Sequence, residues 1–407
     1  MKTNNRYCIL IAGMTIQLCA GIIYGWSVFR DSVAAHLNWD SEAAKLTSSI
    51  MLATFVLGII LGGRMQDKLG PRKVTLAGSV LIGVGMACTA LVPPSAPWLV
   101  YITYGIVAGL GVGTVYMPTI AAVQKWFPDR RGFASGMIVC AFGFSLVVFM
   151  PIAQSMLGTL AEPSLGVTAT FLIFGIGFLL ICVVASLFVK NPPEGYTPES
   201  YTPTAVAPSA KKQYSPPEIL KTKQFFLLVG GLFFTLPAYF ILNPSFKQLT
   251  ETNADLPEIA VLLVMLTGIS SAVGRLVVSW VSDKIGRKSA MVSIAVITLV
   301  ASLTLTVAVS YVFLVCILLI SFAFGGAASV YSAMTADSFG TKYGGMNFGL
   351  VMVGFGLSAL VFQYISTSLD DRTSFIVAAA TCGIAIILVL LLDNPNKSKI
   401  DRKDSLK

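Results

Sequence analysis

The sequence predicts an all-α integral membrane protein with twelve transmembrane helices in two pseudo-symmetric six-helix bundles. Three observations support this. The 407 residues are 55% hydrophobic and only 12% charged, whereas a soluble domain carries roughly 25% charged residues. Apolar runs of helical length recur along the chain, and short loop motifs recur in both halves. Because the polar residues are too few to cover a soluble core of this size, the chain must use lipid as its solvent.

The apolar runs have the length, about 20 residues, that crosses a hydrocarbon layer of roughly 30 Å. The first run is too long for a signal-peptide core, so it is predicted to be a retained helix. The twelve runs are 7–29, 44–63, 74–92, 97–122, 133–155, 168–189, 224–243, 258–280, 290–309, 311–334, 345–367 and 373–392.

The distribution of Lys and Arg predicts the orientation. Of the 28 basic residues, four fall in outer segments if the N-terminus is inside, namely Arg30, Lys45, Lys247 and Arg372. Arg275 falls within a helix, and the remaining 23 fall in cytoplasmic segments. This positive-inside bias predicts a multi-pass protein of the inner (plasma) membrane with both termini cytoplasmic. The same placement in short loops argues against a nucleic-acid partner despite the net charge of +9.

The chain divides into four parts. Residues 1–190 form the predicted N-terminal six-helix bundle and residues 223–393 the C-terminal one. Residues 191–222 are rich in Pro and Ser and are predicted to be a cytoplasmic linker, with a short surface helix near its end. Residues 394–407 form a basic cytoplasmic tail.

Two loop motifs indicate a duplicated unit. The pattern Asp-Lys-x-Gly occurs at 67–70 after the second run and again at 283–286 after the eighth, 216 residues later. A Gly-rich loop at 126–136 after the fourth run has a counterpart at 338–349 after the tenth. Two repeats at a similar offset and at equivalent helix positions predict that the halves share one fold.

The loop at 63–73, with Gly63, Asp67, Gly70 and Arg72, resembles the signature between helices two and three of the major facilitator superfamily. It departs from that signature at Pro71, where a basic residue is usual. Four further segments resemble the oxalate/formate antiporter branch and the related monocarboxylate porters: 21–27, 125–132, 191–196 and 274–287. The resemblance implies a secondary active transporter that works by alternating access, as a monomer.

The signature loops are also predicted to act as gates. Asp67 lies where it can face the positive end of a neighbouring helix and a basic group such as Arg131. Contacts of this kind hold a carrier in one state and break in the other. Alternatively, the basic residues only retain the loops in the cytoplasm. The predicted gating residues are Asp67, Arg72, Arg131, Asp283 and Arg287.

Arg275 is the strongest candidate for substrate binding. It lies eight residues before Asp283, which at 1.5 Å per residue is about 12 Å from the cytoplasmic end of its helix. A charge at that depth costs at least ~2.5–3.5 kcal/mol, so it should face a cavity or a partner. Apart from Glu258 at the first position of the eighth run, no Asp or Glu lies within a predicted run. A bound carboxylate would fit the guanidinium fork; the alternative is a structural arginine bonded to backbone carbonyls or water.

Aromatic and polar side chains complete the predicted site. Gln17 and Tyr24 are spaced to share one helix face with Ala20 and Gly21. Tyr116 follows a stripe of small residues, Gly105, Gly109 and Gly113, which favours close helix packing. By resemblance, Tyr24 and Tyr116 match cavity tyrosines and Arg275 matches a carboxylate-binding arginine. Further candidates are Tyr239, Asn243 and Tyr331, for which ordinary interhelical hydrogen bonding is an equal alternative, and Phe142 and Phe355 as apolar walls.

One departure from the family bears on the substrate. Oxalate/formate exchangers of this family carry a lysine in the eleventh helix, at a position that matches Phe355. One buried cation suits one carboxylate, because a dianion would leave a charge unpaired in a low dielectric. The sequence therefore favours a monocarboxylate resembling lactate or pyruvate. An oxalate/formate-type exchanger and a carboxylate sensor without transport remain alternatives, and the proton coupling of transport stays open.

Other function classes lack their residues. The predicted helices hold no nucleophile–base pair and no phosphate loop, so an enzyme is not expected. The one histidine, His36, and seven cysteines without a C-x-x-C motif predict no metal site and no cofactor. A drug exporter with the same fold would need a wide apolar cavity without a central cation, and Arg275 argues against this alternative.

Overall fold

The computed structural model describes residues 4–127, 131–158, 165–193, 196, 213–252, 256–340 and 343–392. Regular secondary structure within these ranges is entirely helical. Eleven helical segments in the described part are long and apolar enough to cross a membrane. The twelfth predicted span is α4, Pro71–Thr89, whose first turn carries Arg72 and Lys73 and is therefore less apolar. The prediction of an all-helical membrane fold is confirmed.

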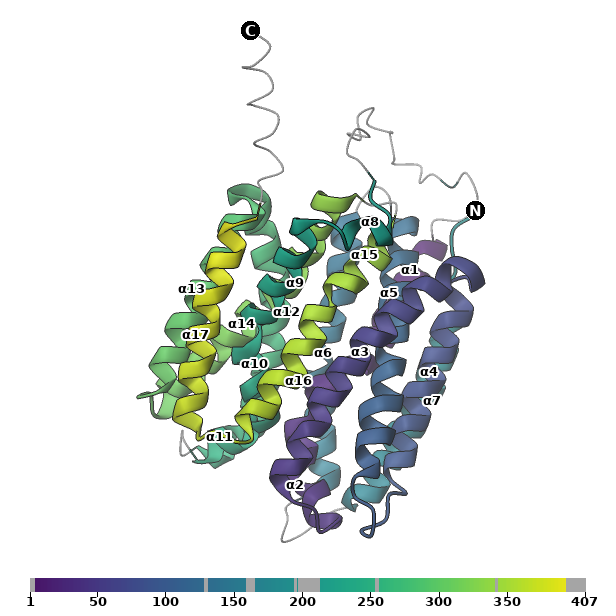
Figure 1. The fold of residues 1–407 in the computed structure, drawn as a ribbon. Helices are drawn as coiled ribbons and strands as arrows, with labels where there is room; N and C mark the ends of the chain where they lie inside the picture. Colours follow the sequence, from purple (N-terminus) through teal and green to yellow (C-terminus); the bar gives the residue numbers. More distant parts are fainter. Residues whose placement is uncertain are drawn as a thin grey trace.

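The first half runs from α1 to α7 (Figure 1). Its first span is interrupted: a short 3₁₀ turn separates two α-helices, and Gly25 follows that turn. The fourth span begins as a π-helix. The elements are α1 (Asn4–Ala20), η1 (Gly21–Tyr24), α2 (Trp26–His36), α3 (Ser41–Leu69), α4, η2 (Tyr101–Ala108), α5 (Gly109–Trp126), α6 (Arg131–Leu157) and α7 (Gly166–Ser186).

The short linker helix α8 precedes the second half, which runs from α9 to α17. Its first span is also interrupted, at Pro237 and again at Pro244, because proline cannot continue the hydrogen-bond ladder of a helix. The elements are α8 (Pro216–Ile219), α9 (Lys223–Thr235), α10 (Pro237–Leu242), η3 (Asn243–Ser245), α11 (Phe246–Thr252), η4 (Pro257–Ile259), α12 (Ala260–Ile285), α13 (Arg287–Leu305), α14 (Ser310–Phe339), α15 (Gly344–Val351), α16 (Val353–Ser366) and α17 (Asp371–Leu390).

Two helix pairs join the halves along their length: α6 packs against α12, and α3 packs against α15 and α16. The start of α1, the end of α17 and α8 lie at one end of the bundle, called here the linker end (Figure 1). The helices α2 and α11 lie at the opposite end, called here the far end. The chain therefore enters and leaves on one side, as an even number of spans requires.

The repeated Asp-Lys-x-Gly motif has the same backbone in both halves. Gly70 ends α3 and Gly286 ends α12, and both adopt a left-handed conformation, with φ of 78° and 92°. Glycine takes this conformation without the steric cost that a side chain brings. In each copy the next helix begins at the following residue. The duplication inferred from sequence thus has a matching local structure.

Several predictions fall partly outside the described residues. The tail at 394–407 and most of the linker at 191–222 belong to this group. The predicted surface helix is present as α8, which a Ser215–Glu218 capping box begins. The exact residue bounds of the two bundles, the linker and the tail stay predictions.

Candidate functional site

Close packing of two helices positions Arg275 in the interior. A Cβ at Gly274 of α12 would lie 2.1 Å from the Phe322 carbonyl oxygen of α14, and one at Gly325 would lie 2.0 Å from the Ser271 carbonyl oxygen. Only glycine allows the two backbones this approach. The Arg275 side chain consequently points away from α14 and toward α6 of the other half, and the residue is only 4% exposed.

The Arg275 guanidinium is incompletely paired. Its Nη1 donates to the Val139 carbonyl oxygen of α6 at 3.0 Å, and its Cζ lies 5.6 Å from the centre of the Phe142 ring. The Tyr24 hydroxyl is within hydrogen-bonding reach. Its Nε is buried without a hydrogen-bond partner, and no ion pair with Arg275 occurs among the described side chains. The carbonyl bond is the contact expected of a structural arginine, but it uses only part of the fork.

Five aromatic rings pack against one another beside this cation, and the group is called here the aromatic cage: Tyr24, Phe142, Tyr239, Phe324 and Phe355. Tyr24 makes edge contacts with Phe142 and Phe324 at centroid distances of 5.5 Å, and with Tyr239 at 5.9 Å. Tyr239 stacks on Phe324 at 3.7 Å, and Phe355 lies 6.0 Å from Phe324. None of the five is more than 5% exposed, so this structure shields the aromatic cage from solvent.

Both halves contribute to the aromatic cage. Tyr24 and Phe142 come from η1 and α6, and the other three rings come from α10, α14 and α16. A movement of one half against the other must therefore open or rearrange the aromatic cage. Chemically, the arrangement offers one guanidinium and two tyrosine hydroxyls within an otherwise apolar enclosure.

One predicted residue, Tyr116, lies at the border of the aromatic cage, in the first half. The Tyr116 ring is half-buried and contacts Phe142 and Phe55, both at 5.3 Å. Gly113 brings α5 onto α3, because a Cβ there would lie 2.0 Å from the Phe55 carbonyl oxygen. The side chain of Gln17 instead ties α1 to α5: its Nε2 donates to the Tyr116 carbonyl oxygen at 3.0 Å and to Thr119 Oγ1 at 2.7 Å.

The expectation that Gln17 and Tyr24 share a face assumed a continuous helix. The 3₁₀ turn at Gly21–Tyr24 changes the angular step per residue, so the two side chains reach different neighbours.

Asn243 and Tyr331 lie outside the aromatic cage. Asn243 is one turn beyond Tyr239 toward the far end, 1% exposed, and neither atom of its amide has a partner. Tyr331 of α14 packs against α9, where its hydroxyl lies 2.6 Å from the position of a Cβ on Gly231. The structure thus gathers Arg275, Tyr24, Tyr239, Phe142 and Phe355, leaves Tyr116 at their edge, and separates Gln17, Asn243 and Tyr331 from them.

The predicted gating residues lie at the linker end. Arg287 pairs with Asp283 and, at 3.5 Å, with Asp337, which joins α12, α13 and α14 within the second half. Arg72 is exposed in the first turn of α4. The side chains of Asp67 and Arg131 lie outside the described residues. The Asp283–Arg287 pair therefore stabilises one half in this structure and does not bridge the two.

The sequence analysis missed Phe324, whose ring stacks on that of Tyr239. The available signal was its spacing: Phe324 precedes Tyr331 by seven residues, two helical turns, on the same face of α14. The sequence analysis also ended the first run at residue 29 and assigned Arg30 to an outer segment beyond it, whereas Arg30 lies within α2 and is 1% exposed.

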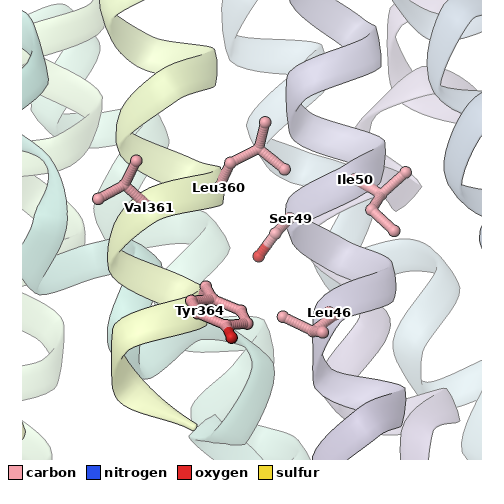
Figure 2. A pocket seen from close by; sticks show the side chains of 6 residues that line it. All are labelled: Leu46, Ser49, Ile50, Leu360, Val361 and Tyr364. Atoms are coloured by element: carbon pink, nitrogen blue, oxygen red, sulfur yellow. The ribbon is translucent and has the colours of Figure 1, made fainter. Parts of the chain in front are cut away.

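A hollow away from Arg275 lies where α3 and α16 pack against each other (Figure 2). Its volume is about 380 Å³, and no charged side chain lines it. Its lining residues are Leu46, Ser49, Ile50, Leu360, Val361 and Tyr364. With no cation in its wall, this pocket offers nothing that would select an anion, and the Arg275 region remains the candidate site.

Comparison with known proteins now assigns the family. The profile of the Major Facilitator Superfamily matches residues 8–249 and 228–406, which is most of the chain. The chain belongs to the Major Facilitator Superfamily. The resemblance of the signature loop is therefore confirmed.

Relatives and solved structures agree with this family. The uncharacterised MFS-type transporter YhjX of Escherichia coli K12 is 27% identical over 362 residues, 88% of this chain and 86% of that protein. The oxalate:formate antiporter of Oxalobacter formigenes is 25% identical over 396 residues, 95% and 90% of the two chains. The structure of the xylose transporter XylE from E. coli matches with a TM-score of 0.71 at 14% identity, covering 97% and 99%, and supports the fold alone.

Proposed function

We propose that this membrane protein is a secondary active transporter of small monocarboxylates, such as lactate or pyruvate, and that Arg275 binds the carboxylate. The observation that carries the proposal is the state of Arg275: a guanidinium in the interior of the protein with a buried, unpartnered Nε and no ion pair among the described side chains. An unsatisfied buried charge is costly, so a ligand that completes its hydrogen bonds gains that free energy on binding.

The surroundings of Arg275 favour a small ligand with one charge. The side chains of the aromatic cage that face it are rings whose polar atoms are limited to the hydroxyls of Tyr24 and Tyr239. A single carboxylate can take both branches of the guanidinium fork, and the hydroxyls can meet a keto or hydroxyl group. A second carboxylate would lie against Phe324 or Phe355, without a counter-charge in this enclosure.

The aromatic cage is also suited to alternating access. The Arg275 guanidinium contacts α6 in the opposite half, and Tyr24 of the first half packs among rings of the second. Sites between the two repeats are the general arrangement in carriers of this kind. We further propose a plasma-membrane location, cytoplasmic termini at the linker end and a monomeric carrier. The far end is then the outer end.

Oxalate/formate exchange is the second candidate, because a relative that covers 95% of this chain is an oxalate:formate antiporter. The aromatic ring at Phe355 distinguishes the two candidates, since only a dianion calls for a second cation. A carboxylate sensor is the third candidate, and it would bind the same anion without moving it.

The test is uptake of labelled lactate into proteoliposomes that contain the purified protein, with and without an inward proton gradient. Unlabelled pyruvate, formate and oxalate serve as competitors. We expect pyruvate to inhibit uptake and oxalate to have little effect, and Arg275→Gln to reduce uptake at least about 100-fold, as the loss of two charge-assisted hydrogen bonds predicts. Stimulation by the gradient would show proton coupling.

Equal uptake by wild type and Arg275→Gln would contradict the site. Stronger inhibition by oxalate than by pyruvate would favour the exchanger. Binding of lactate without uptake would favour the sensor.

A further inference from the structure

Arg30 is the second buried arginine, and its guanidinium bonds span the two halves at the far end. Its Nη1 donates to the Pro244 carbonyl oxygen at 3.1 Å and to Ser245 Oγ at 3.2 Å. Its Nη2 donates to Gln248 Oε1 at 2.7 Å. These three acceptors belong to η3 and α11 of the second half, whereas Arg30 belongs to α2 of the first.

Asp31 supplies the counter-charge. Its Oδ1 lies 2.8 Å from both Nε and Nη2 of Arg30, and it also accepts a bond from Ser41 at 3.4 Å. A guanidinium has five N–H donors. Five donor–acceptor contacts are therefore available to those five donors, so the cation is fully satisfied although it is 1% exposed.

The bonds of Arg30 join segments that occupy equivalent positions in the two halves. The ring contact between Tyr24 and Tyr239 and the hydrogen bond between Arg30 and Ser245 both join residues 215 apart. This offset is within one residue of the 216 that separates the two Asp-Lys-x-Gly motifs. Equivalent segments of the two halves thus meet face to face, at the aromatic cage and again six residues further on, which is about 9 Å in a helix.

The interface between these two contacts is costly to keep closed. Ser27 and Asn243 are each 1% exposed, and their Oγ, Oδ1 and Nδ2 atoms have no hydrogen-bond partner. A buried polar atom without a partner destabilises the state that buries it, and opening the interface would hydrate it. Such a surface can be held together only if other bonds offset that cost.

We propose that Arg30 is the latch of the outer gate: its bonds to Pro244, Ser245 and Gln248 hold the far end shut, and their rupture opens the path from the outer side to the aromatic cage. This inference rests on the transport mechanism of the family and needs no particular substrate. Hydrogen bonds to a charged group are strong enough to dominate such an equilibrium, and they are directional enough to be lost together when α2 and α11 separate.

The latch predicts a change in the conformational equilibrium, which can be measured without substrate. Spin labels at Ala35→Cys of α2 and Thr252→Cys of α11 report the width of the far end by double electron–electron resonance. The background would replace the exposed or half-buried cysteines Cys8, Cys88 and Cys140 by serine. When Arg30 is unchanged, we expect a single short distance between the two spin labels. In Arg30→Gln, we expect the ratio of the wide to the narrow population to rise at least tenfold.

A milder pair of changes and a matched control accompany that variant. Ser245→Ala with Gln248→Ala removes two acceptors, leaves the Arg30–Asp31 pair in place, and should widen the far end in the same direction. Lys45→Gln removes a cation whose salt bridge, to Glu42 at 2.7 Å, stays within α3, so its distribution should match that of wild type.

Unchanged distances in both latch variants would overturn the proposal, and so would equal widening in Lys45→Gln. If Arg30→Gln does not fold, the double acceptor variant decides alone. The measured quantity is a distance between spin labels. The result therefore still tests the latch if the protein does not transport lactate.

Discussion

The two buried arginines differ in one respect: the hydrogen bonds of Arg30 are complete and those of Arg275 are not. Arg30 has an adjacent carboxylate and three acceptors from the other half, whereas Arg275 has one carbonyl bond, the Tyr24 hydroxyl within reach, and an unpartnered Nε. Both are almost fully buried and both reach across the interface between the halves. Burial alone therefore does not distinguish the two arginines, and the proposed binding role of Arg275 rests on the unsatisfied hydrogen-bonding capacity of its guanidinium.

We expect the two arginines to have different roles. A change at Arg275 should alter anion binding, and a change at Arg30 should alter the conformational equilibrium. The variants that follow test this division, beginning with the largest expected effect.

Arg275→Lys keeps the charge and removes the fork. Lysine is a compact point charge and cannot bind a carboxylate through two parallel N–H groups. The loss of one charge-assisted hydrogen bond, roughly 1.5–3 kcal/mol, predicts a rise in KM for lactate of about 10- to 100-fold. The measurement is concentration-dependent uptake into proteoliposomes. A KM within about twofold of wild type would mean that the fork is not used.

Phe355→Lys adds a second cation to the wall of the aromatic cage. Phe355 contacts the rings of Phe240 and Phe324, at 4.9 and 6.0 Å, so a lysine there would be buried beside the substrate. We expect oxalate to become an effective inhibitor of uptake, with its inhibition constant falling about tenfold. Phe355→Met is the control for the lost ring. A gain in oxalate inhibition in both variants would show that space, not charge, had excluded the dianion.

Much of the fold could be predicted because lipid imposes simple rules. The spans follow from apolar runs. The repeat follows from a loop motif in which the left-handed backbone favours glycine, at Gly70 and Gly286. The interruptions of the first span in each half were not predicted, although Gly21, Gly25 and Pro237 mark them. Hydropathy measures whether a segment can lie in lipid, and it is insensitive to a local change of helix type.

The site could be predicted only in part, because contacts between the halves are tertiary. That Arg275 lies within a long helix could be read from the chain, whereas the spacing of Tyr24 was misread because the 3₁₀ turn at Gly21–Tyr24 interrupts its helix. That Tyr239 stacks on Phe324 depends on how α10 and α14 cross, and the bond of Gln17 to Thr119 depends on how α1 and α5 cross. Arg30 was assigned to the outer side because charge counting locates a residue relative to the membrane and says nothing about its partners.

Asn243→Leu tests the cost of the buried, unpartnered polar atoms in the interface. It should change the wide population of the far end in the direction opposite to the latch variants. It removes two buried polar atoms that lack partners, so it should stabilise the closed far end. We expect the wide population, measured between the same two spin labels, to fall a few-fold when Asn243→Leu is combined with Ser245→Ala and Gln248→Ala. A further widening would show that the Asn243 amide itself helps to close the gate.

Tyr331→Phe should have the smallest effect. The Tyr331 hydroxyl packs between α14 and α9 and does not contact the aromatic cage. Its removal should change the KM for lactate by less than about twofold. A tenfold change, with the far-end distance unaltered, would extend the binding region beyond the aromatic cage.

Equilibrium binding of lactate to the purified protein tests the central claim most directly, because it separates the two arginines without requiring transport. We predict that Arg275→Gln weakens lactate binding at least about 100-fold, corresponding to about 2.7 kcal/mol or more, while Arg30→Gln leaves the Kd within a few-fold of wild type. Undiminished binding in Arg275→Gln, or an equal loss in both variants, would contradict the account, since the unsatisfied guanidinium would then not be the group that recognises the anion.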